Sequence, residues 1–327
     1  MRLPEAATDL LRDAADLWIS PHERALTTAE LHTAVAGVDG AVVSLGNRVD
    51  DAFLDASGPR LRVVANIGVG YDNVDVAACR TRGVIVTNTP GVLTDATADL
   101  AFALVLMVTR RLGEAERLVR ERHPWRFGLD FMLGKGINGK TLGIVGLGQI
   151  GAAVARRARA AGMEITYTGR RRAAPELEQE LAARFLSFEE LLATADVVSL
   201  HAPLTPETRH LVGAAALARM KRTAFLVNTS RGAVVDEAAL VEALRNGAIA
   251  GAGLDVYEHE PELHPGLLEL ENVVLLPHLG SATVETRTAM AVLAARNALA
   301  VTQGRAPLTE VVPNQMEGGG VPGSGTG

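Results

Sequence analysis

The feature that most constrains the fold is a glycine-rich turn directly after a short apolar run. The segment 142–145 is typical of a buried strand, and it leads into Gly146-x-Gly148-x-x-Gly151. The Ala- and Arg-rich segment 152–161 follows and predicts a helix. Glycines between a strand and a helix are typical of dinucleotide-binding units, because they permit a tight turn, approach of a pyrophosphate and close helix–strand packing. The helix N-terminus would then bind the pyrophosphate. The alternative is a turn that serves packing alone.

Apolar segments alternate with helical segments on both sides of this turn. We expect strands at 40–44, 61–65, 84–86, 164–168, 197–200, 224–228, 251–254 and 273–276. We expect helices at 4–17, 27–36, 50–56, 74–82, 188–193, 213–218, 237–246, near 267 and at 283–304. A longer helix from about Asp95 to Arg122 has a nearly all-apolar middle, which predicts a place between two domains or subunits. The alternation predicts an α/β fold with a doubly wound parallel sheet.

Length and composition narrow the class of protein. A chain of 327 residues is long for one hydrophobic core, so we expect two domains. A net charge of -6 without a long basic stripe argues against nucleic-acid binding. The single cysteine, Cys79, excludes a disulfide framework and a cysteine-based metal site, and we expect no bound metal. The apolar run 100–108 is too short to span a membrane, and the first residues lack a signal-peptide pattern, so we expect a cytoplasmic protein.

The turn after the strand 164–168 bears on the choice of cofactor. An NAD site usually places Asp or Glu at this strand end, where the carboxylate accepts from the ribose 2′-OH. Here Thr168 and Gly169 are followed by Arg170, Arg171 and Arg172. Arginines can bind a 2′-phosphate bidentately, whereas an acid would repel it. The turn therefore favours NADP(H) and leaves NAD(H) possible, and the alternative is a solvated basic turn.

Three polar residues follow three of the later strands. Arg231 follows the strand at 224–228, Glu260 the one at 251–254 and His278 the one at 273–276. The carboxyl ends of parallel strands are where ligands bind in open α/β sheets. Together these residues suit reduction of a 2-oxo acid. The arginine can bind carboxylate or polarise the carbonyl, the histidine can donate a proton, and the glutamate can orient the imidazole and favour its charged form.

Further stretches carry a resemblance that covers nearly the whole chain. Beside the glycine turn they are 66–75, 87–94, 200–205, 228–236, 253–257 with Glu260-Pro261, and 276–283. With them the chain resembles the D-isomer-specific 2-hydroxyacid dehydrogenase family. Within that family it is most similar to glyoxylate/hydroxypyruvate reductases and 2-ketogluconate reductases. The turn Tyr167-Thr-Gly-Arg170 is similar to that of NADPH-preferring hydroxypyruvate reductases.

The resemblance implies a role for each matching residue. His278 would be the acid/base, Glu260 its partner and Arg231 the substrate anchor. The backbone amides of Val69 and Gly70 would bind the substrate carboxylate, and Leu45 would line the substrate pocket. The cofactor would be bound by the following residues: Thr97, Gly146, Gly148, Gln149, Ile150, Gly151, Thr168, Gly169, Arg170, Arg171, Pro203, Thr229, Asp255 and Gly280.

The resemblance also implies a domain organisation. Residues 1–94 with 284–315 would form a smaller, flavodoxin-like substrate domain, and residues 95–283 would form a Rossmann dinucleotide domain inserted in it. The family usually forms homodimers through the dinucleotide domain. The Gly-rich end, 316–327, predicts a flexible tail. Family members usually begin with an apolar strand before the segment that matches Arg2-Leu3-Pro4, so we expect a truncated chain or a start assigned too late.

The sequence therefore predicts an NADPH-preferring reductase of small 2-oxo acids. Glyoxylate and hydroxypyruvate come first, and the product would be a D-2-hydroxy acid. Two alternatives stay open: a 2-ketogluconate reductase, and a non-catalytic dinucleotide-sensing protein that resembles the family's corepressors. Turnover separates them, because a binding protein would bind the dinucleotide but reduce glyoxylate negligibly.

Overall fold

The structure is a computed structural model that describes residues 3–22, 24 and 26–312. The chain divides into two compact units. Unit 1 comprises the residues up to Leu93 and those from Thr283 on, and unit 2 comprises Thr94–Ala282. The predicted tail, 316–327, and the first two residues lie outside the described part. Each unit contains a parallel sheet flanked by helices, which confirms the predicted α/β class.

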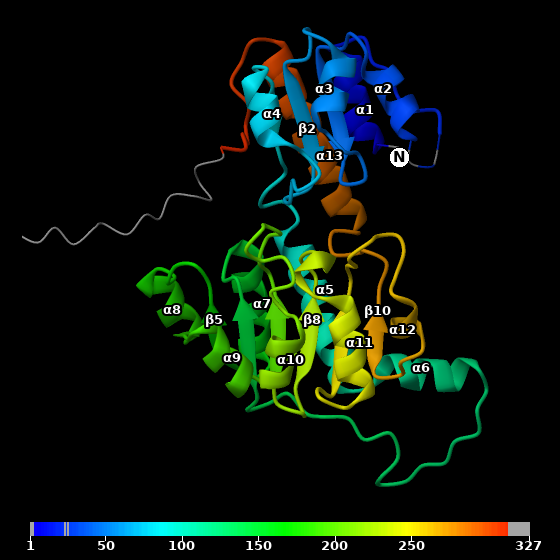
Figure 1. Ribbon diagram of the computed structural model, residues 1–327, viewed down its shortest axis with the longest axis vertical. Coiled ribbons are helices and arrows are strands. Elements are labelled where there is room, and N and C mark those ends of the chain that lie inside the picture. The colour runs from blue at the N-terminus through cyan, green and yellow to red at the C-terminus, as the bar shows by residue number, and fades with distance from the viewer. Residues whose placement is uncertain (1–2, 23, 25, 313–327) are drawn as a thin grey trace, which may run out of the picture. The chain divides into compact units, whose positions relative to one another are not determined.

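The sheet of unit 2 has seven parallel strands in the order β10-β9-β8-β7-β4-β5-β6 (Figure 1). Its strands are β4 (Thr141–Val145), β5 (Glu164–Thr168), β6 (Arg184–Phe185), β7 (Val197–Leu200), β8 (Phe225–Asn228), β9 (Gly251–Leu254) and β10 (Val273–Leu275). The strand order reverses at β4, which pairs with β5 on one side and β7 on the other. Such a switch point is where doubly wound sheets bind dinucleotides, so the predicted Rossmann topology is confirmed.

Helices cover both faces of this sheet (Figure 1). On one face lie α5 (Thr94–Thr109) and α7 (Gln149–Ala160). On the other lie α9 (Phe188–Thr194), α10 (Ala214–Arg219) and α11 (Glu237–Arg245). Short elements complete the unit: α6 (Leu112–Arg120), α8 (Pro175–Leu181), η1 (Gly232–Val234) and α12 (Pro265–Leu268). Each face of the sheet buries its own apolar cluster beneath these helices. The candidate site lies instead at the carboxyl ends of the strands.

The predicted single helix over 95–122 is wrong. The structure ends α5 at Thr109 and begins α6 at Leu112, and between them Arg111 has a left-handed conformation with a φ of 56°. The apolar middle of α5 packs against α7 and against β8, β9 and β10 within unit 2. Packing inside its own unit accounts for the buried positions of this stretch, such as Leu104 and Val105, whereas Phe102, Leu106 and Met107 are only half-buried.

A competing set of backbone contacts explains the break. The Thr109 carbonyl, which a continuing helix would use in its next turn, accepts a hydrogen bond of 2.7 Å from the Lys135 N–H. Gly134 approaches so closely that a Cβ there would lie 2.6 Å from the Thr109 oxygen. The Arg111 guanidinium then binds the Glu114 carboxylate at 2.8 and 2.5 Å. The contacts of Gly134 and Lys135 with Thr109 come from residues distant in sequence, which a helical pattern does not reveal.

The sequence patterns also missed the segment between β5 and α9. It forms α8 and the two-residue strand β6, which extends the sheet beside β5. Pro175 occupies the first position of α8, where its missing N–H costs nothing. Acidic Glu176 and Glu178 follow in the first turn, as the helix dipole favours.

Unit 1 has three parallel strands in the order β1-β2-β3: β1 (Gly40–Ser44), β2 (Val63–Ile67) and β3 (Ile85–Thr87). One face carries α1 (Glu5–Arg12) and α13 (Val284–Thr302). The other carries α2 (Thr28–Val35) and α3 (Asp51–Ser57), and α4 (Val76–Thr81) packs against β3. Thr27 and Glu30 form a complete capping box, which confirms the helix start predicted there.

Candidate functional site

Three polar side chains predicted to act together lie at the carboxyl edge of the unit 2 sheet. Arg231 follows β8, Glu260 follows β9 and His278 follows β10. These strands are neighbours in the sheet. His278 Nδ1 and Glu260 Oε2 share a hydrogen bond of 2.7 Å, and the positive charge of Arg231 acts on Glu260. The structure thus brings the three residues together.

The His278–Glu260 pair is accessible, and the groups around it lower the pKa of Glu260. The side chains are 31% and 34% exposed, so another molecule can reach the imidazole. Burial opposes ionisation of Glu260, but hydrogen bonds with His278 and the Tyr257 N–H, and the charges of His278 and Arg231, outweigh it, so the Glu260 pKa lies below its ordinary value. An ionised Glu260 is an acceptor, which makes His278 Nδ1 the donor and leaves Nε2 for a ligand.

The backbone around His278 is held in an unusual conformation. His278 has a φ of 54°, in the left-handed region that His enters more readily than most residues. Its N–H donates to the Asp255 carbonyl at 2.9 Å. The Asp255 carboxylate accepts from the Leu279 and Gly280 N–H groups, both at 2.7 Å. Burial raises the Asp255 pKa, although those two amides oppose the shift. Asp255 therefore closes the turn that presents the imidazole.

A buried asparagine fixes the backbone of Arg231. Asn228, 1% exposed, donates from its side chain to the Arg231 carbonyl at 2.9 Å. Its side-chain oxygen accepts from the Ser230 N–H and Oγ at 3.0 and 2.8 Å. The Arg231 guanidinium, half-buried, donates to the Ser230 carbonyl at 2.9 Å. The strand end and the turn after it thus set where the guanidinium lies.

The glycine turn between β4 and α7 has the shape that a dinucleotide requires. Gly146 has a φ of 96°, and a Cβ there would lie 2.9 Å from the His201 carbonyl carbon. A Cβ at Gly151 would lie 2.3 Å from the Gly146 oxygen. Gly148, in contrast, faces open space. The turn is therefore tightly packed at its first and third glycines and open at its second, which fits a pyrophosphate at the α7 N-terminus.

Other predicted cofactor residues also lie at this edge. A Cβ at Gly280 would lie 3.4 Å from Thr97 Cγ2 and 3.3 Å from Asp255 Oδ2, so these three residues are neighbours. The Thr229 hydroxyl is buried and makes no hydrogen bond within the described residues. A bound dinucleotide could satisfy it, because buried polar atoms are nearly always paired. Gln149 and Ile150 open α7, and Pro203 follows β7.

The turn after β5 presents no carboxylate at the strand end. Thr168 is buried, and Gly169, Arg170 and Arg171 are exposed. An adenosine ribose at this position of a Rossmann unit would meet two exposed guanidinium groups. Both guanidinium groups can form charge-assisted hydrogen bonds with an anionic group.

The Glu178 carboxylate, which follows the arginine turn, is bonded to two other side chains of unit 2. Its carboxylate binds the Arg172 guanidinium at 2.9 Å and accepts from the Tyr167 hydroxyl. The Tyr167 hydroxyl in turn accepts from the Ala173 N–H at 2.8 Å. Arg172 is thus committed to Glu178, which separates it from the other two arginines of the turn.

The loop after β2 in unit 1 exposes two amides. The carbonyls of Val69 and Gly70 accept from the side chains of Asn88 and Asn66, both at 2.9 Å. Their own N–H groups donate no hydrogen bond within the described residues. Leu45 lies beside this loop, in contact with its first glycine. Two adjacent free amides form an anion-binding arrangement, so the loop can receive a carboxylate.

The sequence patterns assigned no role to His201, which follows β7 at the site edge. Burial lowers the His201 pKa to about 4, so the imidazole is neutral near pH 7. Its Nε2 pairs with the Ser199 Oγ at 2.9 Å, and its backbone packs against Gly146. The signal that could have identified it was its position directly after a parallel strand.

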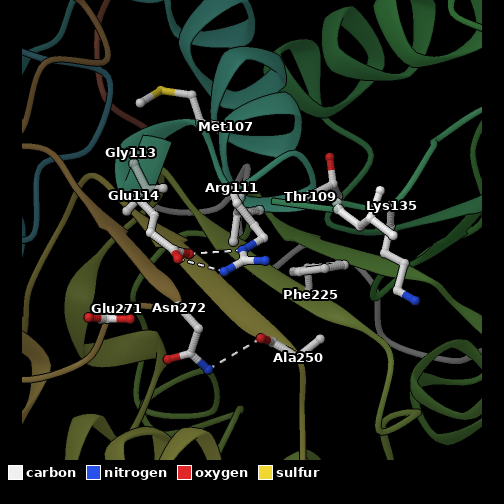
Figure 2. A pocket seen from close by; sticks show the side chains of 14 residues that line it. Met107, Thr109, Arg111, Gly113, Glu114, Lys135, Phe225, Ala250, Glu271 and Asn272 are labelled. Atoms are coloured by element: carbon white, nitrogen blue, oxygen red, sulfur yellow. Dashed lines mark hydrogen bonds and ion pairs between the residues drawn. The ribbon is translucent and has the colours of Figure 1, made fainter. Parts of the chain in front are cut away.

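A separate pocket of about 330 Å³ lies at the other edge of the unit 2 sheet (Figure 2). Phe225, Ala250 and Asn272 line it, each at the beginning of a strand or just before one. The Arg111–Glu114 ion pair also lines it, and Asn272 donates to the Ala250 carbonyl at 3.2 Å. None of the predicted site residues lines this pocket, so it is distinct from the candidate site.

Two other kinds of feature are absent from the described part of the chain. Within residues 3–22, 24 and 26–312, no three His, Cys, Asp or Glu side chains gather as a metal site would require. The helices of the same residues include none that is long and apolar enough to cross a membrane.

Comparison with known proteins identifies the family. Residues 102–280 match the family model described as D-isomer specific 2-hydroxyacid dehydrogenase, NAD binding domain. A glyoxylate reductase of Thermococcus kodakarensis is 49% identical over 313 residues, which cover 94% of this chain and 93% of that protein. The chain belongs to the D-isomer specific 2-hydroxyacid dehydrogenase family. It is accordingly an oxidoreductase that uses a nicotinamide dinucleotide.

Solved structures of this family agree with the fold. A crystal structure of a protein from Thermus thermophilus superposes with a TM-score of 0.88 at 47% identity, covering 95% of this chain and 98% of that one. An NADPH-dependent glyoxylate/hydroxypyruvate reductase of Sinorhizobium meliloti, in complex with NADP and malonate, superposes with a TM-score of 0.82 at 38% identity, covering 95% and 94%. For this 2-hydroxyacid dehydrogenase the match confirms the fold, and the roles of single residues remain to be argued.

Proposed function

We propose that this dehydrogenase reduces small 2-oxo acids, glyoxylate and hydroxypyruvate first, to D-2-hydroxy acids with NADPH. The observation that carries the proposal is the His278–Glu260 hydrogen bond beside Arg231, at the carboxyl edge of a sheet with a dinucleotide-binding turn. The relatives named glyoxylate reductase, at 45–53% identity, support the substrate class.

In this proposal His278 donates the proton and Glu260 stabilises the charged imidazole. A nicotinamide dinucleotide supplies the hydride when it is bound. Reduction of a carbonyl to a hydroxyl also needs a proton, and His278 Nε2 is free to give it because Nδ1 is bonded to Glu260. Ionised Glu260 accepts the hydrogen bond from Nδ1 and so fixes the orientation of the imidazole.

Two groups of residues, each within its own unit, can bind a 2-oxo acid: the exposed amides of unit 1 and Arg231 of unit 2. The free N–H groups of Val69 and Gly70 can each donate to one carboxylate oxygen. Arg231 can bind the substrate through a charge-assisted hydrogen bond, either at the carboxylate or at the 2-oxo group. Leu45 would contact the substituent on C2 of the substrate, which is a hydrogen atom in glyoxylate and a hydroxymethyl group in hydroxypyruvate.

A substrate panel tests this function. Oxidation of NADPH and, separately, of NADH is followed by absorbance with glyoxylate, hydroxypyruvate and 2-ketogluconate at a range of concentrations. We expect the highest kcat/KM with NADPH and one of the first two acids. A higher kcat/KM with 2-ketogluconate would reassign the substrate, and dinucleotide binding without turnover would favour the sensing protein instead.

The arginine turn gives the first mutational prediction. Replacing Arg170 and Arg171 by Ser should raise the KM for NADPH about tenfold per arginine, because each removes a charge-assisted bond to the 2′-phosphate. The KM for NADH should change less than threefold. Arg172→Ser is the matched control, since Arg172 already binds Glu178 and should leave the NADPH preference intact. Equal effects on both dinucleotides would refute the assignment.

We also propose that the protein is a homodimer joined through unit 2. The segment after α6, a long loop in Figure 1, exposes apolar side chains at alternating positions, with Phe127 87% and Leu129 91% exposed. Trp125 and Phe131 flank them and stack on each other at 6.1 Å. Monomeric proteins rarely expose such a run, whereas aromatic residues are enriched in interfaces.

Light scattering after gel filtration tests the assembly. The wild-type chain should elute with twice the mass of one chain, and Phe127→Asp with Leu129→Asp should shift it to a monomer because two buried charges would destabilise the interface. Trp18→Asp, an equally drastic change at an exposed site of unit 1, should leave the mass unchanged. A monomeric wild type would contradict the proposal.

A further inference from the structure

The loop that carries Glu260 is fastened at both ends to one buried carboxylate. Glu237, 6% exposed, begins α11. Its Oε1 accepts from the Glu258 N–H at 2.5 Å, and its Oε2 accepts from the His264 N–H at 3.2 Å. The two amides bracket Glu260, so both ends of the stretch 258–264 are bonded to a single side chain.

A second contact fixes the base of the same loop. A Cβ at Gly232 would lie 1.8 Å from the Tyr257 carbonyl carbon, so the backbones of the two segments touch. The Tyr257 N–H is the donor that holds Glu260 Oε1 at 3.0 Å. Glu237 and Gly232 belong to the segment that also carries Arg231. One stretch of chain therefore presents Arg231 and sets the place of Glu260.

The side-chain bonds of the loop do not replace these two amide bonds. The Glu258 carboxylate, 11% exposed, binds the Arg209 guanidinium and His210 Nε2 at 2.8 and 2.6 Å, and both of these partners are exposed to solvent. Ion pairs with a solvent-exposed partner are screened, whereas an amide that is taken partly out of water and loses its acceptor is costly. Glu237 is thus the contact whose loss would free the loop.

We propose that Glu237 is a positioning residue that acts on the reaction through Glu260. Its carboxylate binds two amides of the loop that carries Glu260. The His278 Nδ1–Glu260 Oε2 bond of 2.7 Å depends on where this loop places the Glu260 carboxylate. A displacement of a catalytic group by about 1 Å can cost up to 10²-fold in rate. The inference rests on the proposed acid/base role of the His278–Glu260 pair.

A double-mutant cycle on the full chain tests the inference. Glu237→Gln keeps the size of the side chain but turns a donor toward one of the two amides. We expect kcat for glyoxylate reduction to fall about tenfold. The affinity for NADPH, measured by fluorescence titration, should change less than twofold. Glu262→Gln, the same replacement at an exposed position inside the loop, should leave kcat unchanged.

The cycle separates positioning from mere stability. In a Glu260→Gln background, Glu237→Gln should lower kcat by less than twofold further, because its effect passes through Glu260. If the two effects on kcat multiply in the double variant, the inference is overturned. It is also overturned if Glu237→Gln leaves kcat unchanged while Glu260→Gln alone lowers kcat. If Glu260→Gln itself leaves kcat unchanged, the proposed acid/base pair fails first. Glu237→Asp, which keeps the charge but shortens the reach, replaces the Gln variant if that one does not fold.

Discussion

Replacing His278 by Asn should lower kcat for glyoxylate reduction by about 10²- to 10⁴-fold, the range that a positioned proton donor contributes. Asn suits the position because it tolerates the left-handed conformation that His278 adopts, with its φ of 54°. The fall therefore reports the lost proton donor and not a strained backbone. The measurement is steady-state oxidation of NADPH at saturating glyoxylate.

His210 offers a matched control for this variant. It too has a left-handed backbone, with a φ of 52°, and it too binds a glutamate, Glu258, at 2.6 Å. We expect His210→Asn to keep kcat within about threefold, since it is not the proton donor. NADPH affinity should be unchanged in both variants. A His278→Asn enzyme with more than a tenth of the wild-type kcat would show that the proton comes from elsewhere.

Replacing Arg231 by Lys should lower kcat/KM for glyoxylate about 10²-fold, mainly through a higher KM. Lysine keeps the charge but loses the planar, bidentate donor geometry that a carboxylate or a 2-oxo acid matches. The Arg231 backbone is fixed by Asn228, so the new side chain cannot be moved to compensate. The comparison is kcat/KM of the two enzymes at one NADPH concentration above its KM.

Arg209→Lys is the control for that substitution. Arg209 lies on the same unit, binds Glu258 at 2.8 Å and is 52% exposed, so its ion pair should be worth little. It should alter kcat/KM less than twofold. A similar small change in Arg231→Lys would exclude Arg231 as the group that binds the substrate.

The sequence patterns predicted most strands and the three residues at their carboxyl ends, for a physical reason. Buried parallel strands are short apolar runs, and a polar residue directly after one lies at the sheet edge whatever the connecting helices do. That is why Arg231, Glu260 and His278 could be expected to meet. The left-handed start of α6 could not, because it depends on the Lys135 N–H reaching the Thr109 carbonyl.

The residues that hold the site in place could not be predicted from the sequence patterns either. Asp255 was expected to line the cofactor, yet both of its carboxylate oxygens accept amides of the turn after His278. Glu237 reads in the sequence as an ordinary acidic residue in the first turn of a helix. Only the fold shows that its carboxylate binds two amides of a loop far along the chain. Side chain-to-backbone bonds of this kind leave no periodic signal.

The most direct test of the central claim is the product formed from hydroxypyruvate and NADPH. Chiral chromatography of the reaction mixture gives the amount and configuration of the glycerate, and the loss of absorbance gives the NADPH consumed. We predict one D-glycerate for each NADPH oxidised, and at most about a hundredth as much with His278→Asn over the same time. L-glycerate, or bound NADPH that is not oxidised by either oxo acid, would contradict the account.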